Sequence, residues 1–262
     1  MGAAGGTSGS LFGPIFVPDR FRDTVAGKAR LQAMLDAEAA LALAEARAGR
    51  IPGKVAEAIV SRCDAGLFDP EEIGRKVLGA GNPVPPLVRA LTDAVSGVSK
   101  DAARHVHEGA TSQDILDTAA MLVSRRTLDP ILAEVDGISA ACARLAGDHR
   151  GTLMAGRTLL QQALPTTFGL KAAGWLVSVL AARRRLRDVR RSGLAAQLGG
   201  AAGTLASLGG RAVSPFFGSL LGSCTSQSPS SRGTRPGSPW WRSGVCSRSS
   251  PAFSGRSRST SS

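Results

Sequence analysis

"HEGATSQDILDTAAMLVSRRTL", residues 107–128, contains a loop that ends where a long helix begins. Gly109 suits the loop, Thr111 is a natural N-cap, and Asp114 three residues later completes a capping-box pattern. An apolar stripe at helical spacing follows, formed by Ile115, Leu116, Ala119, Leu122 and Val123. The stretch predicts an amphipathic helix whose first turn is polar and rich in free backbone N–H groups.

Helical patterns dominate the chain before residue 211, where Ala, Leu, Arg and Glu are frequent. In a predicted helix over 20–48, the residues that recur at helical spacing are Leu31, Met34, Leu35, Glu38, Leu41 and Glu45. Further helices are expected over about 53–63, from Pro70 after the cap Asp69, over 87–95, from Pro130 onward and over 166–198. Because no segment alternates like a strand, the expected fold class is all-α, a bundle of long helices.

Composition excludes several classes of protein. Hydrophobic residues make up 43% of the chain and no apolar run is long enough to cross a bilayer, so we expect a soluble, cytoplasmic protein without a membrane partner. The start of the chain lacks the features of a signal peptide. The four cysteines, Cys63, Cys142, Cys224 and Cys246, lack metal-pair spacing and are expected to be reduced thiols.

The net charge of +12 is unevenly distributed. Seven of the 32 basic residues are arginines after Gly210, where no acid occurs, so the preceding part carries 25 basic residues against 20 acids. Residues 211–262 are rich in Ser, Arg, Pro and Gly, lack periodicity, and are expected to be a disordered tail. The abrupt change indicates a frameshift near codon 210, which translation of the other two reading frames would test.

Two polar clusters are candidate binding sites. Thr111 and Ser112 lie at a predicted helix start, which suits a carboxylate or phosphate, although an ordinary helix cap has the same pattern. His105 and His107 are two residues apart, so they do not share a helix face, but one of them could serve the same site as a donor. The second cluster, "AGRTLLQQALP" at 155–165, lacks any group that titrates near neutral pH.

For this second cluster, ordinary structural roles are alternatives to ligand binding. Arg157 could hold an anion or form a structural ion pair, while Thr158 and Gln161 could contact substrate or cap the next helix. The Gly-rich "QLGGAAGT" at 197–204 lacks the ending of a phosphate loop and favours close packing or a tight turn. The arginines of 183–191 favour a solvated helix face near a C-terminus over a nucleic-acid groove.

The motifs taken together are more specific than each alone. "VHEGATSQDILDTA", "AGRTLLQQALPTTFGLKAAGW" and "QLGGAAGTLASLG" occur in this order, and the chain resembles the fumarase/aspartase superfamily. "LFGPIF" and "GAGNPVPPLV" are similar to its branch of bacterial 3-carboxy-cis,cis-muconate cycloisomerases. The resemblance runs from about Leu11 to Gly210. It divides the chain into an N-terminal helical domain (1–108), a partial, truncated central bundle (109–210) and the tail (211–262).

The resemblance implies a helical homotetramer whose active sites each draw on three subunits, a small tricarboxylate substrate, and no metal or organic cofactor. The implied substrate-binding residues are Asn82, His107, Thr111, Ser112, Arg157, Thr158 and Gln161. A third signature loop of the form G-S-S-x-M-P-x-K-x-N-P carries the catalytic serine in the family's lyases. No stretch of this chain matches that loop, so no catalytic residue is assigned and the chain is expected to be an inactive fragment.

Leu159 stands where many lyases of the superfamily have a histidine that assists proton transfer. A carboxylate leaving group departs as an anion without a proton, since carboxylic acids have a pKa of about 4. The loss of this histidine therefore fits a cycloisomerase, although mutation of a gene that no longer encodes an active enzyme would produce the same change. The alternatives are another lyase such as adenylosuccinate lyase, against which Leu159 argues, and an Arg/Ser-rich nucleic-acid-binding protein.

Overall fold

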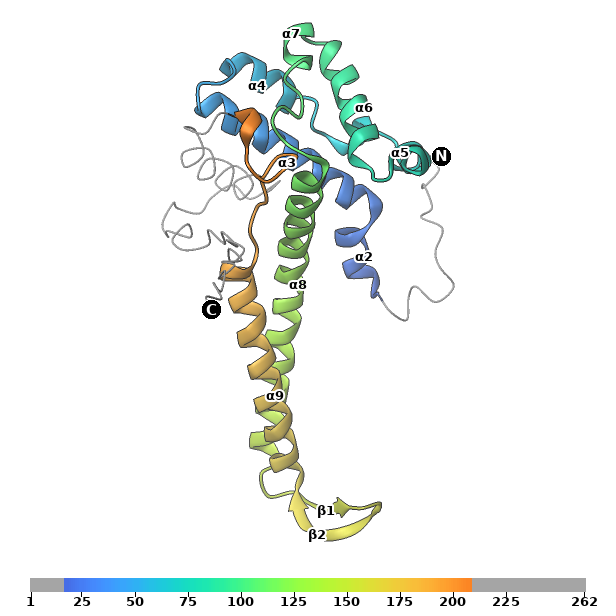
Figure 1. Cartoon of the computed structure of the whole chain (residues 1–262). Helices are drawn as coiled ribbons and strands as arrows, with labels where there is room; N and C mark the ends of the chain where they lie inside the picture. Colours follow the sequence, from blue (N-terminus) through green and yellow to red (C-terminus); the bar gives the residue numbers. More distant parts are fainter. Residues whose placement is uncertain (1–16, 209–262) are drawn as a thin grey trace, which may run out of the picture.

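The computed structural model describes residues 17–208, and the expected tail over 211–262 lies outside this range. A compact helical head contains α2 to α7, and a long arm formed by α8 and α9 extends from it (Figure 1). A hairpin of two strands, β1 and β2, closes the far end of the arm (Figure 1). The expected all-α class is confirmed for the body of the fold, with this hairpin as its one departure within 17–208.

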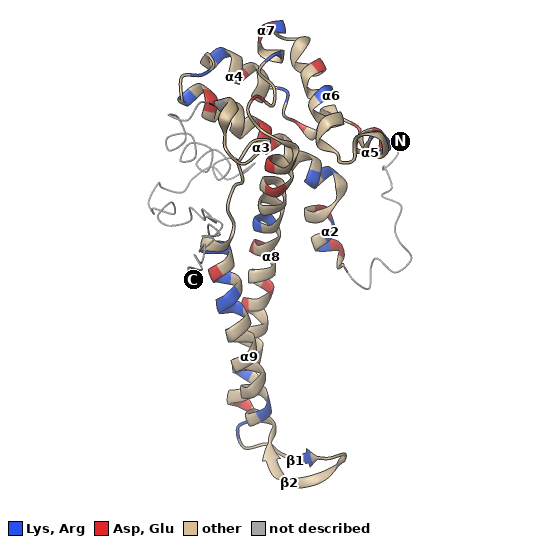
Figure 2. Cartoon of the chain, viewed as in Figure 1, with Lys and Arg blue, Asp and Glu red and all other residues tan. Residues whose placement is uncertain are grey.

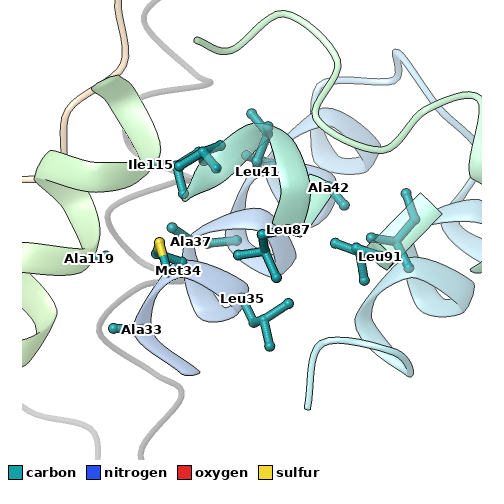
Figure 3. Close-up of a cluster of buried hydrophobic side chains, with 14 of the residues drawn as sticks. Ala33, Met34, Leu35, Ala37, Leu41, Ala42, Leu87, Leu91, Ile115 and Ala119 are labelled. Atoms are coloured by element: carbon teal, nitrogen blue, oxygen red, sulfur yellow. The ribbon is translucent and has the colours of Figure 1, made fainter. Parts of the chain in front are cut away.

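α3 (Gly27–Arg47) is the central helix of the head and is buried along most of its length. Leu35 on α3 packs with Leu87 and Leu91 of α6 (Val84–Ser96), and Ile115 of the arm closes the same cluster (Figure 3). The prediction of a single helix over 20–48 is wrong at its start. Ala26 is extended (ψ 163°) and separates α2 (Asp19–Val25) from α3, a break that the good helix former alanine does not signal.

The other helices of the head begin close to where the sequence predicts. α5 (Pro70–Ala80) starts with Pro70 in its first turn, and the Asp69 carboxylate accepts the Glu71 N–H at 2.9 Å. α4 (Gly53–Val60) ends earlier than expected, and α6 begins three residues before Leu87. The remaining short elements are the 3₁₀ turn η1 (Ala65–Leu67) and α7 (Lys100–Ala103).

α8 (Ser112–Asp148) continues without a break through Pro130, so the expected restart there is wrong. A proline removes one helical hydrogen bond and crowds the carbonyl four residues earlier, at Arg126. The neighbouring residues are held from outside the helix: Arg126 pairs with Asp36 of α3, and Asp129 pairs with Arg190 beyond α9. At 1.5 Å per residue, α8 is roughly 55 Å long.

The hairpin overturns the expectation of no strands. β1 (Leu153–Thr158) pairs antiparallel with β2 (Gln161–Thr167), with a bulge between Ala155 and Arg157. Its residues are mostly exposed on both faces, so neither strand has the alternating hydrophobic pattern that reveals a half-buried strand. Gly156 is required there, because a Cβ would lie 2.6 Å from the Leu164 carbonyl oxygen.

α9 (Phe168–Asp188) is shorter than the helix expected over 166–198. Its N-cap is Thr167, whose hydroxyl accepts the Leu170 N–H, and not Thr158 or Gln161. A π-helical turn, η2 (Val189–Gly193), ends the helix, and an irregular segment then leads to the 3₁₀ turn η3 (Ala206–Leu208). Within 17–208, no helix is both long and apolar enough to span a membrane.

Truncation of Leu91 tests the core of the head. Leu91 is fully buried, so Leu91→Ala should lower the free energy of unfolding by about 2–5 kcal/mol through lost burial and a residual cavity. Leu78→Ala is the control, because Leu78 on α5 is 95% exposed and its loss should change stability by no more than about 0.5 kcal/mol. Urea unfolding measures the free energy of unfolding of both variants. Equal losses in the two would contradict the burial of Leu91 in the core.

Candidate active site

The start of α8 presents two hydroxyl side chains at the N-terminal end of a long helix. Thr111 is extended at the N-cap (φ −121°, ψ 162°), and its N–H donates to Asp114 Oδ2 at 3.0 Å. The predicted cap position and its reciprocal partner Asp114 are therefore confirmed. Ser112 begins the helix and, like Thr111, is half-buried, so two hydroxyls stand beside the positive end of the helix dipole.

Asp114 also connects the helix start to the Gly-rich segment. Its carboxylate accepts the Gly199 N–H at 2.8 Å and the Gly200 N–H at 2.9 Å, and the residue is only 2% exposed. Gly200 has a positive φ of 68°, and a Cβ there would lie 3.2 Å from the Gly109 carbonyl oxygen. The expectation of close packing and a tight turn for "QLGGAAGT" is confirmed.

His107 lies next to this helix start. Its Nδ1 is 2.6 Å from Oε1 of Glu38, which is 2% exposed on α3. Burial by itself lowers the pKa of His107, but the hydrogen bond to Glu38 and the charges of Glu38 and Asp114 outweigh it and raise the pKa above its ordinary 6.5. His105 instead pairs with Glu108 at 2.6 Å. Of the two histidines, His107 is the one that lies close to Asp114.

The other predicted site residues lie elsewhere. Asn82 Oδ1 accepts the Val84 N–H at 3.0 Å, which engages its side chain in starting α6. Arg157, Thr158 and Gln161 are exposed in the hairpin at the far end of the arm (Figure 1). Since α8 separates the hairpin from Thr111, one copy of the chain does not bring the two polar clusters together.

Basic positions near the end of α9 lie alongside acidic positions of α8 (Figure 2). Arg183 and Arg187 pair with Asp136, Arg190 pairs with Asp129, and Arg191 pairs with Asp188. These pairs fit the expected solvated helix face. In the part of the chain that the structure describes, no group of three or more His, Cys, Asp or Glu side chains could hold a metal ion.

Two buried acids on α3 were placed on its recurring face by the sequence but were not predicted as site residues. Glu38 and Glu45 occupy the apolar face of α3, and their place among the leucines at helical spacing was a visible signal. Glu45 is fully buried, and within the described residues neither of its carboxylate oxygens has a hydrogen-bond partner. Burial, followed by the charge of Glu108, raises the pKa of Glu45 to about 8, although Arg50 opposes the shift.

The described residues thus form a long helix pair with a polar helix start at one end and a polar hairpin at the other. A family profile described as "Lyase" matches residues 17–232. The chain therefore belongs to the lyase family of the fumarase/aspartase superfamily. The match continues past Gly210, where we expected the resemblance to end.

Among its relatives are a 3-carboxy-cis,cis-muconate cycloisomerase of Bradyrhizobium diazoefficiens, 46% identical over 203 residues, and a nitrosuccinate lyase of Streptomyces davaonensis, 48% identical over 196 residues. These alignments cover 78% and 75% of this chain but 45% and 41% of the relatives. The crystal structure of a 3-carboxy-cis,cis-muconate lactonizing enzyme from Pseudomonas putida superimposes with a TM-score of 0.78 at 39% identity, covering 82% of this chain and 49% of that one. The chain thus spans less than half of the length of these relatives.

Removal of the Asp114 carboxylate tests its role as an anchor. Asp114→Ala leaves three backbone N–H groups without their acceptor, and it should cost about 3 kcal/mol or more in unfolding free energy. Asp117→Ala, one turn further along α8, loses only a contact with Gln113 and should cost less than about 1 kcal/mol. Urea unfolding followed by circular dichroism compares them. If Asp114→Ala lowers the unfolding free energy no more than the control does, the Asp114 carboxylate does not hold these segments together.

The buried proton of Glu45 should make stability depend on pH. The folded chain keeps this proton up to about pH 8, whereas an unfolded chain releases it near pH 4.5. The contribution of the protonated Glu45 to stability is therefore complete below pH 4.5. It falls as the pH rises toward 8, by at most about 1.4 kcal/mol per pH unit. Urea midpoints between pH 5.5 and 8 should fall less steeply in Glu45→Gln. Exposed Glu57→Gln should keep the wild-type slope, and parallel slopes in all three proteins would refute the prediction.

Proposed function

We propose that this chain forms the N-terminal part of a 3-carboxy-cis,cis-muconate cycloisomerase, which closes its substrate to 4-carboxymuconolactone in protocatechuate breakdown. The observation that carries the proposal is the polar, N–H-rich start of α8 in a chain whose hairpin has Leu159 in place of a proton-transferring histidine. The names of relatives at 46% and 43% identity support it.

The proposed chemistry needs side chains that bind the carboxylates of the substrate. One substrate carboxylate binds to the hydroxyls of Thr111 and Ser112 at the start of α8, and another binds to Arg157, Thr158 and Gln161. A carboxylate oxygen then adds to the conjugated double bond, forming the ring C–O bond and leaving a carbanion delocalised into a neighbouring carboxylate. Fixed donors stabilise that charge because they are already oriented before it develops. A proton delivered to carbon completes the lactone.

Leu159 lies in the turn of the hairpin, with a positive φ of 41° and 92% exposure. In the reverse reaction the leaving group is a carboxylate, which departs as an anion, so an acid at this position is not needed. Elimination of an amine differs, because the amine must be protonated to leave. The hairpin of this chain is therefore suited to leaving groups that are stable anions.

The two polar clusters meet only if copies of the chain associate. The arm exposes large apolar side chains, which marks an association surface. The most exposed on α9 and the hairpin are Leu153, Leu159, Leu160, Leu164, Leu170 and Val177. We propose that the arms pack side by side in a homotetramer, so that the hairpin of one copy reaches the α8 start of another.

A second candidate is a nitrosuccinate lyase, favoured by a relative at 48% identity. Expulsion of a nitro group produces nitrite, which is also a stable anion, so Leu159 fits both reactions. The substrates differ in that the muconate carries three carboxylates on a conjugated diene. The function test therefore includes both substrates.

The direct test is a chimera that joins residues 17–208 of this chain to the remaining half of the Bradyrhizobium enzyme. It should lactonise 3-carboxy-cis,cis-muconate at roughly 1 per second or more, measured by loss of muconate absorbance. Thr111→Ala or Ser112→Ala should lower kcat/KM by about 10-fold or more, because each removes a hydrogen bond to a charged group. Leu159→His should not increase turnover.

The 262-residue chain alone should show little or no turnover, because no stretch of it matches the third signature loop. Lactonisation by the chain alone would show that the active site is misplaced. A chimera that is active only as Leu159→His would overturn the leaving-group argument. A chimera that eliminates nitrite from nitrosuccinate but leaves the muconate unchanged would favour the second candidate.

A further inference from the structure

Acidic residues gather where α3 meets the start of α8 (Figure 2). Glu38 is buried on α3 and Asp114 is buried on α8, each only 2% exposed. A buried carboxylate is costly unless it is hydrogen-bonded or paired with a cation. Asp114 is satisfied by backbone N–H groups, whereas Glu38 has a contact with His107 through Oε1 and, within the described residues, no hydrogen-bond partner for Oε2.

His107 is held in an unusual backbone conformation. Its φ of 62° lies in the left-handed region, which few residues other than glycine adopt, and Gly109 two residues later has a φ of 74°. The loop around it lies between α7 and α8 and belongs to neither helix. The bond from Nδ1 to Glu38 therefore fixes the imidazole from a rigid neighbouring helix and leaves Nε2 as the ring nitrogen available to a ligand.

The charge balance at the α8 start would favour a cation beside a bound carboxylate. The helix N-terminus supplies only about half a positive charge, and the Asp114 carboxylate already occupies part of it. An incoming carboxylate would meet Asp114 and Glu38 as two negative neighbours. A protonated His107 would offset that repulsion, because its Nδ1 contacts Glu38 and the charges of Glu38 and Asp114 both raise its pKa.

We propose that Glu38 is a positioning residue, which fixes the imidazole of His107 through Nδ1 so that Nε2–H donates to a substrate carboxylate bound at the start of α8. The inference rests on the proposed function for the existence of that substrate carboxylate. It assigns a task to a residue of α3 that lies outside the sequence motifs. A purely structural tie between α3 and the loop would shift the titration of His107 in the same way, so the kinetic experiment with the chimera distinguishes the two roles.

The first experiment uses the full chain and does not require activity. The sequence contains three histidines, so ¹⁵N-detected imidazole NMR resolves their signals. The variants His105→Gln and His149→Gln show which signal belongs to each histidine. His107 should titrate above 6.5, and Glu38→Gln, which keeps the size and an acceptor oxygen but removes the charge, should lower that pKa by about one to three units.

Glu45→Gln is the matched control, because Glu45 is a second buried acid on α3, seven residues from Glu38, and no hydrogen bond joins it to His107 within the described residues. It should leave the titration of His107 unchanged. Equal effects of the two substitutions would overturn the proposal. If Glu38→Gln loses its helical circular dichroism signal, the wild-type titration decides, and a His107 pKa at or below 6.5 overturns the proposal.

The second experiment uses the chimera with 3-carboxy-cis,cis-muconate. Glu38→Gln should raise KM about 10-fold with a smaller change in kcat, and it should shift the alkaline limb of the kcat/KM profile to lower pH. Glu45→Gln should change neither. An active chimera whose KM and pH profile are insensitive to Glu38→Gln overturns the proposal, whereas an inactive chimera with the expected NMR shift refutes the proposed function and leaves the Glu38–His107 pair standing.

Discussion

The Asp114 carboxylate organises this fold by accepting backbone N–H groups from two distant parts of the chain. One of these is Thr111, at the start of α8, and the others are Gly199 and Gly200, after the end of α9. Thr118 adds a second tie, donating to the Gln197 carbonyl at 3.1 Å and accepting the Gln197 N–H at 3.0 Å. The chain can therefore run down α8, turn at the hairpin, return along α9 and dock against the helix start from which it left.

The sequence predicted best those features that local chemistry determines. The cap at Thr111 with Asp114 and the Asp69–Pro70 helix start satisfy backbone groups within a few residues. The glycines at 199–200 indicated close packing, although their N–H groups bind Asp114, 85 and 86 positions away. Ala26 and Pro130 could not be predicted because tertiary contacts decide them: a good helix former interrupts a helix, and a helix breaker lies within one. The exposed hairpin carries no periodic signal, since neither of its faces is buried.

The candidate site was predictable as two sets of residues but not as one place. Motif resemblance selected Thr111, Ser112 and the hairpin residues, while the length of α8 holds these groups at opposite ends of the arm. Glu38 escaped prediction for another reason. Its place in an alanine-rich helix indicates burial, but its contact with His107 joins residues 69 positions apart, which no local pattern can show.

The uninterrupted course of α8 has an evolutionary consequence. Each residue of an α-helix adds 1.5 Å of length and about 100° of rotation, so a single insertion between Ser112 and Asp148 would both lengthen the arm and turn the hairpin away from its partner. An insertion of about seven residues makes nearly two full turns and preserves the direction, but it still lengthens the arm. Homologous genes should therefore keep the residue count of this segment almost fixed, and their differences in length should collect in the loops of the head.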